Sequence, residues 1–159
     1  MSARFSLIEE AHVIPAFVPI DTTGAARAGD YVNMSYAKTM WCIIMQGAWA
    51  GGTPAVTMTQ GTTASGGTTS SFTAFSAWNG VALTDDQLAA VTVSSGTFNL
   101  TATANTFTVV RAFAESMEAG KKFLRIDIAS PGSNADLIAG VYILTDLKYE
   151  GKFPPVMIA

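Results

Sequence analysis

The chain has 159 residues, of which 49% are hydrophobic and 13% are charged, and its formal net charge is −3. This length predicts one domain, and an acidic balance without a basic patch excludes a nucleic-acid partner. One cysteine, Cys42, excludes an internal disulfide and a Cys-based zinc site, and no apolar run is long enough to predict a membrane span.

The first predicted element, residues 13–20, is apolar but contains two prolines. Because proline cannot donate to a strand ladder, this segment predicts an edge strand or an extended arm. We expect an N-terminal extended arm over residues 1–24, a β-sandwich domain over 25–150 and an irregular C-terminal tail over 151–159. We expect no signal peptide, since the first ten residues contain no uninterrupted apolar stretch.

The next predicted elements are two strands and a loop. Residues 40–48 are apolar apart from Gln46 and lack proline, which predicts a central strand. Residues 56–60 alternate with a period of two, which places Val56 and Met58 on one face. Residues 61–71 contain only Gly, Thr, Ser and one Ala, which predicts a loop that is mobile or ordered by a partner.

A further strand over residues 72–78 is expected to end at a tight turn, Asn79–Gly80. One short helix is expected to begin at Thr84, where a capping Thr is followed three residues later by Gln87. Asp85 and Asp86 then lie in the first turn, where the helix dipole favours negative charge.

The last predicted elements are strands. Residues 97–103 and 106–114 predict a β-hairpin around a turn at 104–105. Residues 122–129 alternate, and residues 137–147 form a long apolar strand. With seven to nine strands and one short helix, the expected fold is all-β: an antiparallel β-sandwich with jelly-roll topology and extended terminal arms.

Residues that could carry catalysis are sparse. His12 is the only histidine and has no Ser or Cys motif placed for it, and the carboxylates are scattered singly. We therefore expect no enzyme, no metal and no cofactor. A carboxylate-based glycosidase stays an alternative that would need two neighbouring acids. The three tryptophans, Trp41, Trp49 and Trp78, favour core packing over a sugar-binding platform.

Several features indicate an assembly component. Within residues 39–110 only Asp85 and Asp86 are charged, so the folded chain must expose much neutral surface, which another copy or another protein would cover. The proline-containing ends could add to a neighbour's sheet edge, and the small-residue loop could be ordered by a partner. The candidate contact residues come from the arm and from the loop: His12, Val13, Pro15, Phe17, Pro19, Thr62, Thr63, Thr68 and Thr69.

Two C-terminal segments carry a resemblance. Residues 120–128 (GKKFLRIDI) and 139–149 (AGVYILTDLKY), together with the strand that contains Trp41, resemble small structural proteins of tailed-bacteriophage virions, of the head-decoration or cement type. The resemblance is one of strand pattern and transfers no functional residue.

The resemblance implies a virion protein that is made in the host bacterial cytoplasm and located on the capsid surface. It would bind the major capsid protein lattice as a homo-oligomer, a trimer, and stabilise the head. The alternative is a tail, neck or fibre module, which could bind a glycan through Trp49 or Trp78.

Overall fold

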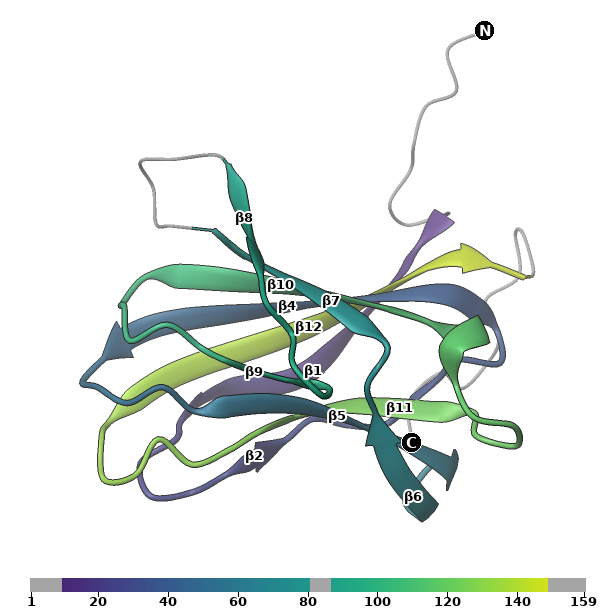
Figure 1. Ribbon diagram of the computed structural model, residues 1–159, viewed down its shortest axis with the longest axis horizontal. Helices are drawn as coiled ribbons and strands as arrows, with labels where there is room; N and C mark the ends of the chain where they lie inside the picture. The colour runs from purple at the N-terminus through teal and green to yellow at the C-terminus, as the bar shows by residue number, and fades with distance from the viewer. Residues whose placement is uncertain (1–9, 81–86, 149–159) are drawn as a thin grey trace, which may run out of the picture.

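The computed structural model describes residues 10–80 and 87–148, which form two packed antiparallel sheets (Figure 1). The first sheet contains, in spatial order, β1 (His12–Asp21), β12 (Asp136–Leu147), β4 (Ala37–Trp49), β10 (Thr106–Phe113), β7 (Phe75–Gly80) and β8 (Leu88–Val91). The second contains β2 (Arg27–Ala28), β11 (Phe123–Ile128), β5 (Ala55–Thr63) and β6 (Gly66–Phe72), with β3 (Val32–Asn33) beside β11 and β9 (Thr97–Asn99) beside β5.

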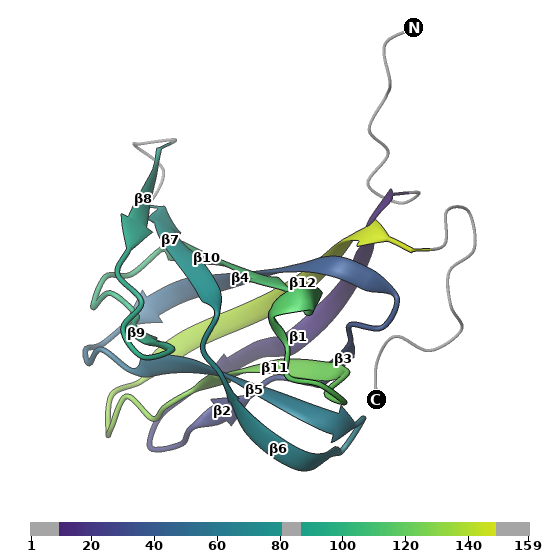
Figure 2. The same ribbon diagram turned by 45° about the vertical axis from the view of Figure 1, so that its right-hand side comes forward.

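The order of the strands confirms the predicted sandwich. The first strands pair with the last, because β1 lies beside β12 and β2 beside β11, while β4 and β5 lie on the far sides of the same two strands. This winding is that of a jelly roll, in which β10 is inserted between β4 and β7. Figure 2 shows the two layers and the connections that cross between them.

The core lies between the two sheets and follows the alternation of the strands. On β4 the side chains of Met40, Cys42 and Ile44 are fully buried, and β11 contributes Leu124 and Ile126 from the opposite layer. Strand β4 pairs with β12 on one side and with β10 on the other, so the predicted central strand is confirmed. Burial raises the pKa of the Cys42 thiol above its ordinary value, which makes this side chain an unreactive apolar residue.

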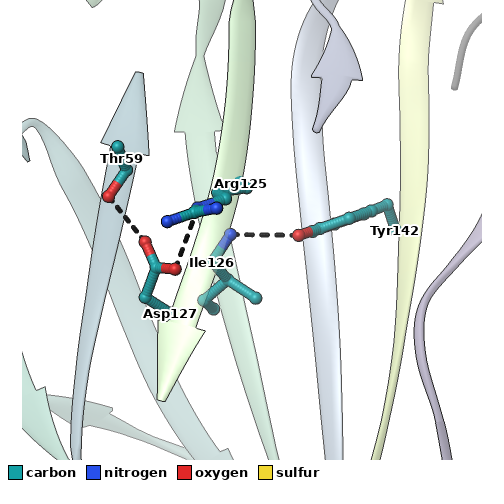
Figure 3. Close-up of polar contacts among 5 residues, drawn as sticks. All are labelled: Thr59, Arg125, Ile126, Asp127 and Tyr142. Carbon is teal, nitrogen blue, oxygen red and sulfur yellow. Dashed lines mark hydrogen bonds and ion pairs between the residues drawn. The ribbon is translucent and has the colours of Figure 1, made fainter. Parts of the chain in front are cut away.

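Tyr142 connects the two sheets through the core (Figure 3). It projects from β12, and its hydroxyl accepts a hydrogen bond of 3.0 Å from the backbone N–H of Ile126 on β11. This N–H lies in the gap between β2 and β3, where the edge of β11 that faces away from β5 has no neighbouring strand. Gly29 fills the same gap by donating its N–H to the carbonyl of Ile126. The phenol therefore satisfies a buried donor that the ladder leaves open.

Two predicted local elements are wrong. The predicted helix does not continue over residues 88–90, because Ala89 and Ala90 belong to β8 and pair with Asn79 and Trp78 of β7. Its first residues, 84–86, lie outside the described part of the chain. The predicted turn at Asn79–Gly80 is also strand, and a Cβ atom at Gly80 would meet the ring of Phe107.

The predicted hairpin of residues 97–103 and 106–114 is also wrong. Strand β9 pairs with β5 in the second sheet, whereas β10 pairs with β4 and β7 in the first. The connection between them crosses the sandwich because Phe98 and Leu100 are both buried in the core. A helical turn, η1 (Ala114–Ser116), follows β10.

Candidate interaction surfaces

The predicted contact residues of the N-terminal segment lie on β1, so the edge-strand alternative holds for residues 12–21. Val13 is 50% exposed, and Pro15 and Pro19 are also exposed. His12 is half-buried, and Phe17 packs its ring over Gly140 of β12. Residues 1–9 of the predicted arm, and the tail over 151–159, lie outside the described residues.

The backbone of β1 is a poor template for strand addition. Its register with β12 shifts twice, between Pro15 and Phe17 and again before Ile20. The two prolines lack an N–H, and the carbonyl of Ala16 already accepts from the N–H of Asp30. The surface of β1 therefore consists of side chains, chiefly Val13, Pro15, Val18 and Pro19, and offers no regular backbone edge.

The Gly/Thr/Ser segment is a β-hairpin, which corrects the predicted loop. Thr62 and Thr63 lie on β5, and Thr68 and Thr69 lie on β6. Threonine is β-branched and favours strands. After the turn, Gly66 and Gly67 take φ values of +96° and +57°, which residues other than glycine rarely adopt.

This hairpin is held by contacts of its own. The hydroxyl of Thr62 accepts from the N–H of Thr68 at 3.2 Å, and Ser70 donates to the carboxylate of Glu118 at 2.9 Å. Lys121 also donates to the carbonyl of Thr68. These contacts within the chain hold the hairpin against the segment that follows η1. Since β1 and β6 belong to opposite edges of different sheets, the structure does not bring the two predicted contact groups together.

The face of the first sheet that points away from the second sheet is an apolar surface that the sequence analysis did not identify. Its side chains are the alternate residues of the strands, those not directed into the core. We call this surface the outer face. On five adjacent strands it comprises Val13 and Pro15 of β1; Leu137, Ala139, Val141, Ile143 and Thr145 of β12; Thr39, Trp41, Ile43 and Met45 of β4; Phe107, Val109, Arg111 and Phe113 of β10; and Ser76 and Trp78 of β7.

One charged side chain of these strands, Arg111, stands within the outer face. Its Cζ atom lies 5.4 Å from the ring centre of Trp41, 5.1 Å from that of Trp78 and 4.9 Å from that of Phe113. The two indole rings are 6.5 Å apart. The Nε atom of Arg111 is buried and has no hydrogen-bond partner among the described residues. The guanidinium is therefore held by cation–π contacts, while its Nε lacks an acceptor among the described residues.

The tryptophans correct the prediction that all three fill the core. Trp41 and Trp78 are partly exposed on the outer face beside Arg111. Trp49 packs at the margin of the core and donates its indole N–H to the carbonyl of Gly52 at 3.1 Å. A run of apolar residues without alternation, such as 40–45, was the signal that both faces of a strand are apolar.

The side of the second sheet that points away from the first sheet is polar. Arg125 forms an ion pair of 2.9 Å with Asp127, which accepts a hydrogen bond of 2.6 Å from the hydroxyl of Thr59 (Figure 3). The guanidinium also stacks on Tyr31 at 4.7 Å from the ring centre. A shallow cavity of about 350 Å³ adjoins this ion pair and is lined by Arg27, Arg125 and Asp127 among others.

The described residues contain no group of three or more His, Cys, Asp or Glu side chains close enough to hold a metal ion. Nor does any helix of the described part have the length and apolar character that a membrane span requires.

Comparisons with known proteins place the chain in no family. No family model matches it, and no curated protein matches its sequence. Among solved structures it is similar to the SPBc2 prophage-derived protein YomS, with a TM-score of 0.44 and 13% identity over 84% of this chain and 93% of that chain.

It is also similar to a structure of infectious bursal disease virus, Gt strain, with a TM-score of 0.27 and 11% identity over 91% of this chain and 46% of that chain. A mutant VP2 protein from derived particles of the same virus gives a TM-score of 0.27 and 10% identity over 91% and 44% of the two chains.

Proposed function

We propose that the chain is a non-enzymatic structural protein of a bacteriophage virion, which binds the capsid lattice as an oligomer and stabilises the head. The observation that carries the proposal is the outer face of the first sheet. An antiparallel sheet with one free side normally turns polar side chains to water on that side. Here the free side is apolar over five adjacent strands, which is typical of a surface that is covered in an assembly.

The mechanism that we propose is additive burial. Each copy contributes a modest apolar contact, and linking several copies makes the binding multivalent, so that the avidity exceeds the affinity of one contact. The partner in this proposal is the major capsid protein lattice, and the protein is located on the capsid surface. The resemblance of the C-terminal strands implies a trimer.

The experiment that tests the function locates the protein in purified particles of the phage whose genome encodes it. We expect cryo-electron microscopy to find it on heads at a copy number tied to the lattice. We also expect heads that lack it to release their DNA at a lower temperature. Particles that contain no copy of the protein would refute a virion role.

A second candidate function is a tail, neck or fibre module that binds a glycan. The observation that favours it is the partly exposed indole of Trp78, whereas Trp49 is engaged with Gly52 and with the core. A sugar that stacks on Trp78 would change the tryptophan fluorescence, and the Trp78→Ala variant would lose this change. Localisation of the protein to the tail would favour this candidate over the first.

A further inference from the structure

The outer face has about the size of a stable protein–protein interface. Adjacent strands are about 4.8 Å apart, and about eight residues of each strand span roughly 26 Å. The five strands of the outer face, from β1 to β7, thus present roughly 600 Å². A standard interface buries about 800 Å² on each partner, so one similar face would cover this one.

The composition of the outer face matches that of a sheet packed on another sheet. Side chains such as Ile43, Val109 and Ile143 are of the kind that fills the core on the inner side, and aromatic residues flank them. Phe107 and Met45 are 37% and 45% exposed, so large apolar groups remain in contact with solvent when the chain is alone. A second sheet of the same character would remove them from water.

Charge complementarity indicates that the covering sheet belongs to a second copy of this chain. Arg111 brings one cation that no ion pair among the described residues neutralises, so a covering surface that carries a carboxylate would complement it. An exposed carboxylate stands at one end of the same face: Asp146 accepts from the hydroxyls of Thr39 at 2.8 Å and Thr145 at 3.4 Å, and these two residues are cross-strand neighbours on the outer side. The face therefore carries both members of an ion pair, held apart within one copy.

A two-fold axis that passes between these two groups brings them together across the interface. In such an isologous contact, Arg111 of one copy meets Asp146 of the other, and the reverse pair forms at the same time. We propose that two copies of this chain pair through their outer faces, with Arg111 and Asp146 as the reciprocal ion pairs. The proposal rests on the proposed function: it assigns the outer face to the contact between copies, makes the pair the assembly unit in place of a trimer, and leaves the contact with the capsid lattice to other surfaces.

The test is the oligomeric state of the purified full chain, measured by sedimentation velocity and by light scattering across a dilution series. The expected species has twice the mass of the 16.6 kDa chain. Arg111→Gln should raise the dissociation constant of the dimer about tenfold or more, since it removes both reciprocal charge-assisted pairs. Arg125→Gln is the matched control, because it removes an aromatic-stacked guanidinium from the second sheet and should leave the association unchanged.

A charge reversal keeps the test decisive if the neutral variant is ambiguous. Arg111→Glu should give monomers, and the added change Asp146→Lys should restore the pair at least in part. Far-UV circular dichroism establishes that each variant is folded. A wild-type chain that stays monomeric overturns the proposal, as does an oligomer of another size or a dimer that Arg111→Glu leaves intact.

The two proposals fail separately. A monomer that is nevertheless found on phage heads refutes the pairing and leaves the virion function standing, with the outer face covered by a capsid protein or by another part of this chain. A dimer that is absent from virions refutes the function and leaves the pairing standing.

Discussion

The hydrogen bond from Ile126 to Tyr142 allows a stringent test of the fold. The Tyr142→Phe variant keeps the ring in the core and removes the acceptor of the Ile126 N–H, which is 3.0 Å away and buried. A buried donor that loses its partner costs about 1–3 kcal/mol. For a chain of this size each kcal/mol lowers the Tm by about 2–4 °C, so the expected decrease lies between roughly 2 and 12 °C.

The same variant should change the response to alkaline pH. Burial raises the pKa of the Tyr142 phenol well above its ordinary value of 10, so the folded state holds the neutral form more strongly than the unfolded state does. The stability that this provides is fully present below pH 10 and is lost as the pH rises through the folded-state pKa. Tyr142→Phe should therefore lose stability less steeply above pH 10, while the buried Cys42, whose pKa is raised in the same direction, keeps part of the effect.

The measurements are thermal unfolding at pH 7, which gives the Tm, and urea unfolding at a series of pH values up to about 11. Tyr31→Phe is the control, since the Tyr31 hydroxyl has no hydrogen bond among the described residues and its ring packs against Arg125. If the two variants have the same Tm at pH 7, the assigned role of the Tyr142 hydroxyl is wrong.

Three further predictions concern other buried groups. Gly61→Ala should destabilise the hairpin by about 1–3 kcal/mol, because the new Cβ would collide with the backbone carbonyl of Gly66; limited proteolysis at the hairpin would detect this. Asp136→Ala should cost about 1–3 kcal/mol in urea unfolding, because the buried carboxylate accepts from the N–H of Ala50 at 2.6 Å, and Asp136→Asn should cost less because it keeps an acceptor. Cys42 should react with a disulfide reagent only when the chain is unfolded, since burial raises its pKa; rapid reaction of the native protein would contradict its placement in the core.

The strands that the sequence predicted correctly are those whose apolar pattern determines their burial. Residues 56–60 and 122–129 alternate, and the structure buries Val56, Met58, Leu124 and Ile126 as the alternation requires. The long apolar run at 137–147 became β12. In these segments hydrophobic burial decides the register, because a shift of one residue would turn each side chain to the opposite face.

The wrong predictions arose where a local signal competed with strand pairing. The capping pattern at Thr84 favours a helix, but Ala89 and Ala90 gain ladder hydrogen bonds beside β7. Asn79–Gly80 has turn chemistry, but Gly80 is present to admit the ring of Phe107. The pairing of β9 with β5 depends on which sheet each strand joins, and local sequence does not encode that choice.

The sequence does not reveal the outer face, because an apolar run such as that of β4 predicts a strand in the middle of a sheet but does not show whether a layer covers both of its faces. A strand in the middle of a sheet is flanked on both edges, but its two faces are covered only if a layer lies on each. Trp41, Ile43 and Met45 alternate with the core residues of β4, and the second sheet covers one face alone. The apolar run of β4 therefore provides side chains for two surfaces. One is the core of this chain, and the other is the outer face around Arg111, which in our proposal is covered by the same apolar sheet of a second copy.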